Sequence, residues 1–267
     1  MDLKNKTIKD FGEQWTTYTS NDGFYGSLEL FEDMVSPLIT VKELANKRVA
    51  EIGSGTGRIA IMLLNAGVSH VTAIEPSDAF YVLQHNIAIL DNAARRTRLI
   101  KCPGDEIPEN INVDYIFSIG VLHHIPDPDP VVKAAYKALS QGGKILVWLY
   151  GKEGNQLYLF FIYPIRKLTK LLPHSLLVLL VWILYLPLMA YSLLCHWFPL
   201  PLKDYLVNVI CKMSPDKRRL VIYDQLNPAY AKYYTKDEAE SLLTRNGFKN
   251  VTIHHRRGYS WTVSGEK

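Results

Sequence analysis

The chain has 267 residues, enough for one large domain or for one domain with a substantial insertion. With 48% hydrophobic and 21% charged residues it is expected to fold around a core, and its net charge of +4 is too small to indicate a nucleic-acid partner. Three cysteines without CxxC spacing and an N-terminus without an apolar run predict reduced thiols in a cytoplasmic protein. They argue against a disulfide framework.

The first 47 residues are polar with scattered aromatic side chains, and we expect residues 1–47 to form an N-terminal helical and aromatic segment. Within it, the spacing of Leu28, Phe31 and Val35 places apolar side chains on one face of a helix. From residue 48 the pattern changes to short β-branched strands that alternate with helical stretches, which predicts an α/β fold with a mainly parallel, Rossmann-like sheet.

Seven strands are expected in chain order: 48–53, 70–76, 98–105, 113–120, 142–150, 251–257 and 259–267. The alternation stops after the fifth strand and resumes with a helix at 235–248, whose first half carries acidic residues. We therefore expect one domain built from 48–150 and 235–267, interrupted by an apolar, mainly helical insertion at 151–234.

The stretch VAEIGSGTGR joins the first strand to the next helix through a glycine-rich turn. Gly53, Gly55 and Gly57 allow a tight turn and a close approach of the backbone to a ligand. The N–H groups at the start of the helix favour a polar or anionic ligand. By itself this turn is compatible with several nucleotide cofactors. The dinucleotide pattern GxGxxG is not met, because the third glycine falls one residue early.

Together with Glu51, two positions before the first glycine, the turn resembles motif I of the class I S-adenosylmethionine-dependent methyltransferases. The segments GDEIP (104–108), VDYIFSIGVLHHI (113–125) and LSQGGKILV (139–147) follow the order of motifs in the small-molecule branch of that family, the type 11/12-like enzymes. The resemblance implies S-adenosylmethionine as cofactor. It also implies a seven-stranded sheet in which the final strand is inserted antiparallel between the fifth and the sixth. FGEQWTTY (11–18) is similar to a segment that often covers the cofactor.

The resemblance implies cofactor contacts at each of these motifs. Glu75, about twenty residues past the turn, would bind the ribose hydroxyls, and Asp105 would receive the adenine amino group. Ser118 and Ile119 would contact the cofactor through their backbone. The complete set of expected cofactor residues is Glu51, Gly53, Ser54, Gly55, Gly57, Glu75, Asp105, Glu106, Ser118 and Ile119.

Two histidines follow the fourth strand, at the edge of the sheet where ligands of open α/β folds bind. His124 and His123 are therefore candidate bases for removing a proton from the acceptor, although His124 matches a family position whose role is often structural. A second basic group, 254–257, is read either as a solvated turn or as a site for an anionic acceptor. No set of residues has a metal-ligand spacing, so no metal is expected.

The insertion contains a run, 171–202, without a single Asp, Glu, Lys or Arg, which is long enough to span a bilayer. A single crossing is not expected, because strands of one sheet precede and follow it. Its four prolines are expected to divide it into short helices. Basic residues flank it: Arg166, Lys167, Lys170, Lys203, Lys212, Lys217, Arg218 and Arg219. Two interpretations remain, an element lying in the inner leaflet of a membrane and a lid or dimer interface packed on the domain.

The sequence thus predicts a methyltransferase on the cytoplasmic face of a membrane, peripheral to it. The acceptor would be small or amphipathic, with lipid-linked molecules and glycan precursors among the candidates. Two alternatives stay open: an NAD-type oxidoreductase, and a non-catalytic, membrane-attached scaffold with a methyltransferase-like fold. The sequence does not indicate the acceptor or the oligomeric state.

Overall fold

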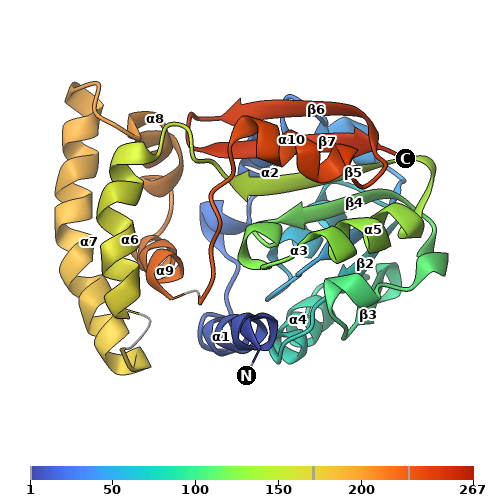
Figure 1. Cartoon of the computed structure of the whole chain (residues 1–267). Coiled ribbons are helices and arrows are strands. Elements are labelled where there is room, and N and C mark those ends of the chain that lie inside the picture. Colours follow the sequence, from blue (N-terminus) through green and yellow to red (C-terminus); the bar gives the residue numbers. More distant parts are fainter. Residues whose placement is uncertain (1, 170–171, 228) are drawn as a thin grey trace.

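A computed structural model describes residues 2–169, 172–227 and 229–267 of the chain. Its centre is a seven-stranded sheet with the strand order β3-β2-β1-β4-β5-β7-β6 (Figure 1). The strands are β1 (Arg48–Ile52), β2 (His70–Ile74), β3 (Thr97–Ile100), β4 (Val113–Ile119), β5 (Leu139–Tyr150), β6 (Lys249–Arg256) and β7 (Ser260–Glu266). The first five are parallel, while β7 pairs antiparallel with both β5 and β6. The predicted α/β fold and the place of its last strand are confirmed.

Helices cover both faces of the sheet. They are α1 (Leu3–Thr17), α2 (Leu28–Val35), α3 (Arg58–Asn65), α4 (Ala79–Ala88), α5 (Asp129–Ala138) and α10 (Lys236–Thr244). Short 3₁₀ turns join the elements: η1 (Gly23–Gly26), η2 (Val41–Leu44), η3 (Ala94–Arg96), η4 (Gly104–Glu106), η5 (Glu109–Ile111) and η6 (Leu122–His124). The helix predicted from the spacing of apolar residues after Leu28 is confirmed as α2. Its N-cap is Ser27, whose side chain accepts from the N–H of Leu30.

The sheet separates two apolar cores. Phe117 of β4 packs with α2 and α3, whereas its neighbour Ile116 packs with α5 and α10 on the other face. Successive side chains of a strand point to opposite faces, so a strand that is buried on both sides needs a continuous apolar run. The sequence YIFSI of β4 provides such a run, with the small, fully buried Ser118 as its one polar side chain. This two-sided burial holds the carboxyl ends of the parallel strands in a fixed array at one edge of the sheet.

The insertion between β5 and α10 forms a helical layer beyond that edge (Figure 1). It consists of α6 (Gln156–Thr169), α7 (His174–Trp197), α8 (Lys203–Tyr205), the π-helical turn η7 (Leu206–Ile210) and α9 (Pro215–Leu226). α9 is sandwiched in this layer, since Leu220 belongs to the core next to the sheet and Leu226 to a third core shared with α6 and α7. The insertion is therefore packed onto the domain through α9.

The expectation that prolines divide the apolar run into short helices is wrong. α7 continues for 24 residues with Pro187 inside it. A proline removes one backbone donor and disturbs one turn, and the hydrogen bonds on either side keep this long helix together. Pro173 only caps its start. Leu171, where the run begins, and the flanking Lys170 lie outside the described residues, as do Met1 and Pro228.

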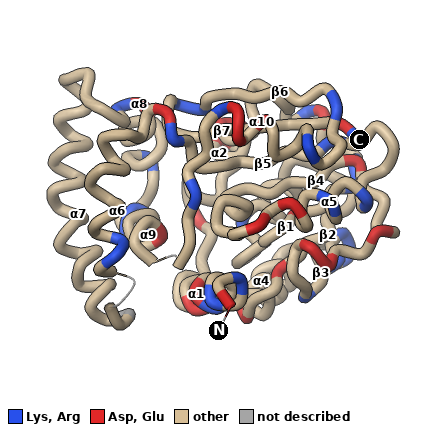
Figure 2. The backbone as a smooth tube through the Cα atoms, viewed as in Figure 1, with Lys and Arg blue, Asp and Glu red and all other residues tan. Residues whose placement is uncertain are grey.

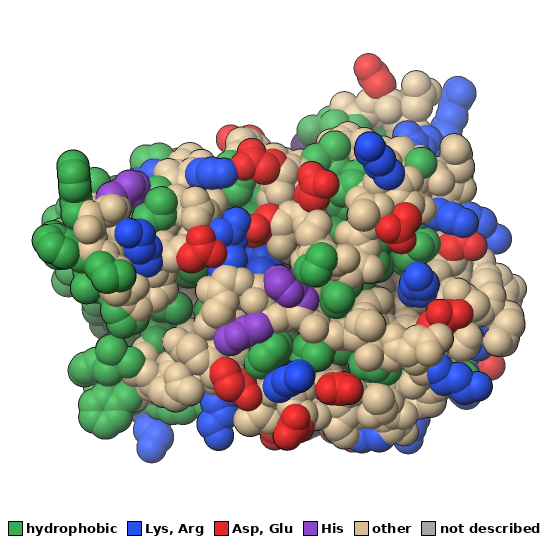
Figure 3. All heavy atoms as spheres, turned by 90° about the horizontal axis from the view of Figure 1, so that it is seen from above, with side chains coloured by type: hydrophobic (Ala, Val, Ile, Leu, Met, Phe, Trp, Pro, Cys, Tyr) green, Lys and Arg blue, Asp and Glu red, His purple; other side chains and the backbone are tan. Residues whose placement is uncertain are grey.

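Charged residues avoid the outer part of the insertion. The tube of α7 carries no Lys, Arg, Asp or Glu, whereas the rest of the molecule carries both signs (Figure 2). Hydrophobic side chains gather at this end of the molecule in the space-filling view (Figure 3). Two of the basic residues expected to flank the run do not present their charge to solvent. Arg166 is 5% exposed and Lys217 is 6% exposed.

Candidate functional site

A cavity of about 1050 Å³ lies where the sheet, α1 and the insertion meet. The glycine turn and the carboxyl ends of β1, β2, β4 and β5 form one side of it, α1 forms a second, and α6, α7 and α9 form a third. Ligands of open parallel sheets bind outside the carboxyl ends of the strands. The cavity is thus in the position expected for a binding site of this fold.

The glycine turn after β1 requires its glycines. Gly53, Gly55 and Gly57 have φ angles of 75°, 52° and 88°, a region that other residues rarely adopt. A Cβ atom on Gly53 would lie 2.6 Å from the Val121 side chain, and one on Gly57 would lie 2.8 Å from that of Leu83. Gly53, Ser54 and Gly55 line the cavity, whereas Gly57 supports the turn from behind.

Glu75 follows β2 and ties the turn to it. Its Oε2 accepts from the N–H of Gly55 at 2.8 Å, and its Oε1 accepts from the N–H and the hydroxyl of Ser77 at 2.9 and 2.5 Å. The carboxylate lines the cavity next to the turn, although Glu75 is 5% exposed. It is therefore positioned to receive hydroxyl donors that a ligand brings to the turn.

Glu51 is a buried carboxyl group without a complete set of partners. It is 2% exposed, it lines the cavity, and its Oε2 has no hydrogen-bond partner. Burial raises the pKa of this group to about 8, with the Glu75 charge adding to the effect. An unpaired buried acid is costly, so this position favours a ligand that brings a positive charge or a donor.

The remaining expected cofactor residues are distributed around the cavity and behind it. Asp105, in η4, lines the cavity and forms a 2.7 Å ion pair with Lys4 of α1. Ile119 also lines it, at the end of β4. The described cavity lining does not include Glu106, which is exposed, or Ser118, which is fully buried.

The two candidate histidines are in different environments. His123 is fully buried and stacks on Tyr150 with 3.8 Å between ring centroids, and it does not line the cavity. Burial lowers the pKa of His123 well below its usual value, so it is a neutral packing residue. A base that removes a proton from a ligand must reach it, and the His123 ring is screened from the cavity.

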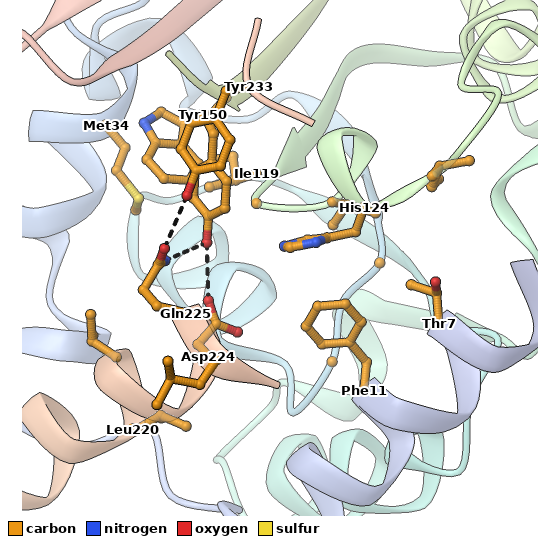
Figure 4. A pocket seen from close by; sticks show the side chains of 18 of the residues that line it. Thr7, Phe11, Met34, Ile119, His124, Tyr150, Leu220, Asp224, Gln225 and Tyr233 are labelled. Atoms are coloured by element: carbon orange, nitrogen blue, oxygen red, sulfur yellow. Dashed lines mark hydrogen bonds between the residues drawn. The ribbon is translucent and has the colours of Figure 1, made fainter. Parts of the chain in front are cut away.

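His124 does line the cavity. Its Nδ1 donates to the carbonyl oxygen of Tyr230 at 2.8 Å, which leaves Nε2 as the acceptor of a neutral ring. Burial lowers the pKa of His124 to about 4, although the Asp224 charge acts in the opposite direction. Its ring lies against Phe11 of α1, with 4.7 Å between the centroids (Figure 4).

Opposite His124, the insertion contributes a polar network that the sequence did not predict. The Tyr150 hydroxyl donates to Oδ2 of Asp224 at 3.1 Å and accepts from Nε2 of Gln225 at 2.8 Å (Figure 4). Gln225 Oε1 in turn accepts from the hydroxyls of Tyr158 and Tyr233. Seventy-four positions separate Tyr150 from Asp224. No local pattern marks such a pair.

The basic group at the end of β6 is not a solvated turn. Arg256 is 3% exposed and pairs with Asp33 and the Tyr259 hydroxyl. Arg257 pairs with Asp33 at 2.6 Å and with Asp204 at 2.8 Å. Both guanidinium charges are already compensated by carboxylates, so the structure assigns them to joining α2, β6 and the insertion. An anionic acceptor would have to displace these partners.

Comparison with known proteins identifies the fold and the motif-bearing segment. Residues 50–145 match a family model described as a methyltransferase domain. An S-adenosylmethionine-dependent methyltransferase of Thermotoga maritima superposes with a TM-score of 0.51 at 15% identity, over 90% of this chain and 89% of its own. The chain contains a class I S-adenosylmethionine-dependent methyltransferase domain. Human N-acetylserotonin methyltransferase, solved in complex with S-adenosylmethionine, has a TM-score of 0.52 at 13% identity, over 96% of this chain and 56% of its own.

Two curated relatives match somewhat less than half of this chain. The ubiquinone biosynthesis O-methyltransferase of Pseudomonas fluorescens is 29% identical over 134 residues, which are 49% of this chain and 56% of that protein. The tRNA U34 carboxymethyltransferase of Vibrio cholerae is 27% identical over 116 residues, 43% of this chain and 36% of that protein. The match thus spans about half the length of the first of these relatives and a smaller share of the second.

The residues of the methyltransferase domain fit S-adenosylmethionine on observations of their own. The unpartnered Oε2 of Glu51 suits the positive charge of the cofactor's methionine part. A Cβ on Gly55 would project toward the indole of Trp15, 3.4 Å from its Nε1, so only a glycine keeps this part of the cavity open. The chemistry of the donor set and the shape of the turn therefore agree with this cofactor.

Proposed function

We propose that this protein transfers a methyl group from S-adenosylmethionine to a small, apolar or amphipathic acceptor. The observation that carries the proposal is one continuous cavity that runs from the glycine turn to the apolar helices of the insertion. Residues 48–150 and 235–267 would hold the cofactor, while 1–47 and 151–234 would enclose the acceptor. Such a division supplies the proximity of two reactants on which methyl transfer depends.

In this proposal the cofactor binds along the glycine turn. Glu51 would hold its cationic methionine part, Glu75 its ribose hydroxyls and Asp105 its adenine amino group. The glycine turn, Gly53–Gly57 including Ser54, would let the backbone approach the cofactor closely. Ile119, at the end of β4, would contact the cofactor through its backbone. Glu106 and Ser118 would act through their backbone or through their neighbours. When bound, the sulfonium supplies an electrophilic methyl group.

His124 would help to hold the acceptor. Its neutral ring presents Nε2 as a hydrogen-bond acceptor because Nδ1 donates to the Tyr230 carbonyl. Phe11 and Trp15 of α1 line the same cavity and would exclude water from it. With a pKa of about 4, His124 is a weak base, so orientation of the acceptor is its proposed task.

An apolar acceptor is favoured by the lining of the insertion side. Leu184, Leu188, Leu220 and many similar residues form that wall, which suits a ring or chain and not a strand of nucleic acid. The Pseudomonas relative is named for ubiquinone biosynthesis, and an amphipathic, hydroxylated ring would fit the same lining here. Lipid-linked molecules are acceptors of this kind. The lining offers less to a polar glycan precursor.

Binding of S-adenosylhomocysteine tests the proposal directly. We expect it to raise the melting temperature of the protein, while NAD has no effect. Stabilisation by NAD alone would support the oxidoreductase alternative and overturn the proposal. A scaffold without activity would be supported if neither compound binds, because then no cofactor reaches the glycine turn.

We further propose that the outer surface of the insertion lies on a membrane. The apolar face, which we define as the exposed side chains of α6 and α7, includes Phe160, Phe161, Ile183, Leu186 and Trp197. Within the described residues, one helix is long and apolar enough to cross a bilayer, Ser175–Trp197 with a mean hydropathy of 2.3, and only 17% of its most apolar stretch is buried. By length and composition alone, one such helix is weak support.

Lying on the membrane, rather than crossing it, agrees with the sheet. β5 precedes α7, and β6 and β7 follow it. β7 is hydrogen-bonded to both β5 and β6, so a single crossing would divide one sheet. α6 cannot supply a second crossing, since its 14 residues extend for about 21 Å against roughly 30 Å of hydrocarbon. Phe161 of α6 and Pro187 of α7 also line the cavity, which would give an acceptor in the membrane a short path into it.

Flotation with vesicles tests this second proposal. Wild type is expected to float with vesicles of phosphatidylethanolamine and phosphatidylglycerol, and the double variant Ile183→Glu, Leu186→Glu to stay in the soluble fraction. Ile89→Glu is the matched control, because Ile89 is an equally exposed isoleucine at the end of α4. Wild type that never floats would support the interpretation of the apolar face as a protein interface.

A further inference from the structure

Asp224 is an isolated charge in the apolar half of the cavity. Among the described insertion residues that line the cavity it is the only one with a charged side chain. The described residues also contain no ion pair of Asp224. A carboxylate in apolar surroundings is costly unless it is hydrogen-bonded. Its presence on this wall therefore needs an explanation.

Two donors from distant elements hold the carboxylate in a fixed orientation. Gln14 of α1 donates through Nε2 to Oδ1 at 2.9 Å, and Tyr150 of β5 donates to Oδ2 at 3.1 Å. Gln14 is fully buried and is itself held by Asn227 Nδ2 at 3.1 Å. An ionised carboxylate can accept about four hydrogen bonds, so each oxygen of Asp224 keeps accepting capacity for a ligand.

Across the cavity from Asp224 lie His124 and Phe11 (Figure 4). The free ring nitrogen of His124 accepts hydrogen bonds, because its other nitrogen donates to a carbonyl. The two polar groups that face one another here are thus both acceptors. A ligand between them would be bound best if it brought a hydrogen-bond donor, and Phe11 would cover the apolar body next to that donor.

We infer that Asp224 is the specificity-determining residue of the acceptor site, and that it selects apolar molecules that end in a hydroxyl or amine group. The inference rests on the proposed function, in which this half of the cavity holds the acceptor. It identifies the chemical class of the acceptor, since hydroxyl and amine groups are also the groups that a methyl group can be transferred to. The methylated product of a phenol has lost the donor and would be released more easily.

A pair of probes tests the inference. 4-Butylphenol has a donor at the end of an apolar body, and 4-butylanisole has the same body with the hydroxyl methylated. Their binding to wild type, saturated with S-adenosylhomocysteine, is measured by calorimetry or by the fluorescence of Trp15 and Trp148, which line the cavity. We expect wild type to bind the phenol about tenfold or more tightly, as a hydrogen bond to a charged group implies.

Asp224→Asn keeps the shape of the side chain and removes its charge. We expect it to weaken 4-butylphenol by about tenfold while 4-butylanisole binds as in wild type. The control is Asp216→Asn, the same change on an exposed part of the same helix. It should leave the affinities for 4-butylphenol and 4-butylanisole unchanged. If Asp224→Asn fails to fold, it will bind neither probe. The inference is then tested by wild type alone, through its preference for 4-butylphenol over 4-butylanisole.

Equal binding of the two probes by wild type would overturn the inference, and so would an Asp224→Asn variant that keeps the preference for the phenol. These results are separate from the fate of the proposed function, which fails only if wild type does not bind S-adenosylhomocysteine. If the cofactor product binds and the phenol does not, the methyltransferase proposal stands and the assignment of Asp224 falls.

Discussion

The amide group of Gln14 donates a 2.9 Å hydrogen bond to Oδ1 of Asp224, although 210 positions separate the two residues. It joins α1 to α9 of the insertion, where both helices form walls of the cavity. Both segments lie outside residues 50–145, which match the methyltransferase family model. The wall of the acceptor half of the cavity therefore depends on how these two additions pack against each other.

Replacing Gln14 by Leu should destabilise the protein. The half-buried carboxylate of Asp224 would lose one donor, and we expect the free energy of unfolding to fall by about 1–3 kcal/mol. Urea denaturation measures this change. Glu13→Gln is the control, because Glu13 is on the exposed side of the same helix and should change stability by less than about 0.5 kcal/mol. Unfolding of Gln14→Leu at the wild-type urea concentration would mean that the bond contributes nothing.

Glu51 should make cofactor binding depend on pH. In the free protein its pKa is raised to about 8 by burial, so it is protonated at neutral pH. A bound cation would favour the ionised form, so binding should release a proton below pH 8, and the affinity for S-adenosylmethionine should rise with pH, by up to about tenfold per unit, until pH 8. Calorimetry in buffers of different ionisation enthalpy counts the protons released.

Glu51→Gln serves as the comparison, since it cannot ionise. It should release no proton from this position and should lose the slope that wild type shows between pH 6 and pH 8. The same raised pKa lowers the stability of the free protein as pH rises from the unfolded value near 4.5 toward 8, because the folded state then holds a proton that the unfolded state has released. If the affinities of wild type and Glu51→Gln for the cofactor changed with pH in the same way, this role of Glu51 would be ruled out.

Asp105 can bind adenine only if it releases Lys4 or shares its carboxylate. The pair is partly exposed, with side-chain exposures of 37% and 26%, so it contributes little, about 0.2–1 kcal/mol. Lys4→Met should therefore leave the affinity for S-adenosylhomocysteine within about fivefold of wild type, or raise it. Asp105→Asn should lower it by more than that. Titration calorimetry compares the affinities of the two variants for S-adenosylhomocysteine. Equal losses of affinity would mean that binding depends on the ion pair and not on the Asp105 carboxylate.

Gly55→Arg should abolish cofactor binding. Gly55 has a positive φ of 52°, and its missing side chain would point at Trp15 inside the cavity. The loss is measured as the absence of a thermal shift with S-adenosylhomocysteine. Gly23→Arg is the matched control, since Gly23 also has a positive φ, of 64°, but has open space around it. Both variants place a side chain at a residue with positive φ, so a thermal shift that is lost only in Gly55→Arg reports on the cavity.

The sheet and the cofactor half of the cavity could be predicted because their signals are local. A strand buried on both faces is a short apolar run, as in YIFSI of β4, and a glycine turn is a run of five residues. Side chains at the carboxyl ends of parallel strands must meet at one edge. The motif positions therefore implied a common site before any contact was known.

The continuity of helix α7 and the burial of His123 could not be predicted from the sequence and became known only from the tertiary structure. The prolines of the apolar run predicted short helices, but α7 continues through Pro187 and packs along α9. His123 and His124 are adjacent in sequence and indistinguishable by composition, yet one is sealed under Tyr150 and the other lines the cavity. Burial is set by neighbours that arrive from elsewhere in the chain.

The sequence by itself determined the fold, the cofactor class and the uncharged character of the insertion, since each is written in contiguous residues. Only the tertiary structure decided that Gln14, Tyr150 and Asp224 meet. Asp224 follows Tyr150 by 74 positions and Gln14 by 210 positions. The three side chains meet only because helices pack against one edge of the sheet. Hydrogen bonds between such distant side chains leave no periodic pattern, so the polar end of the acceptor cavity appears only once the chain is folded.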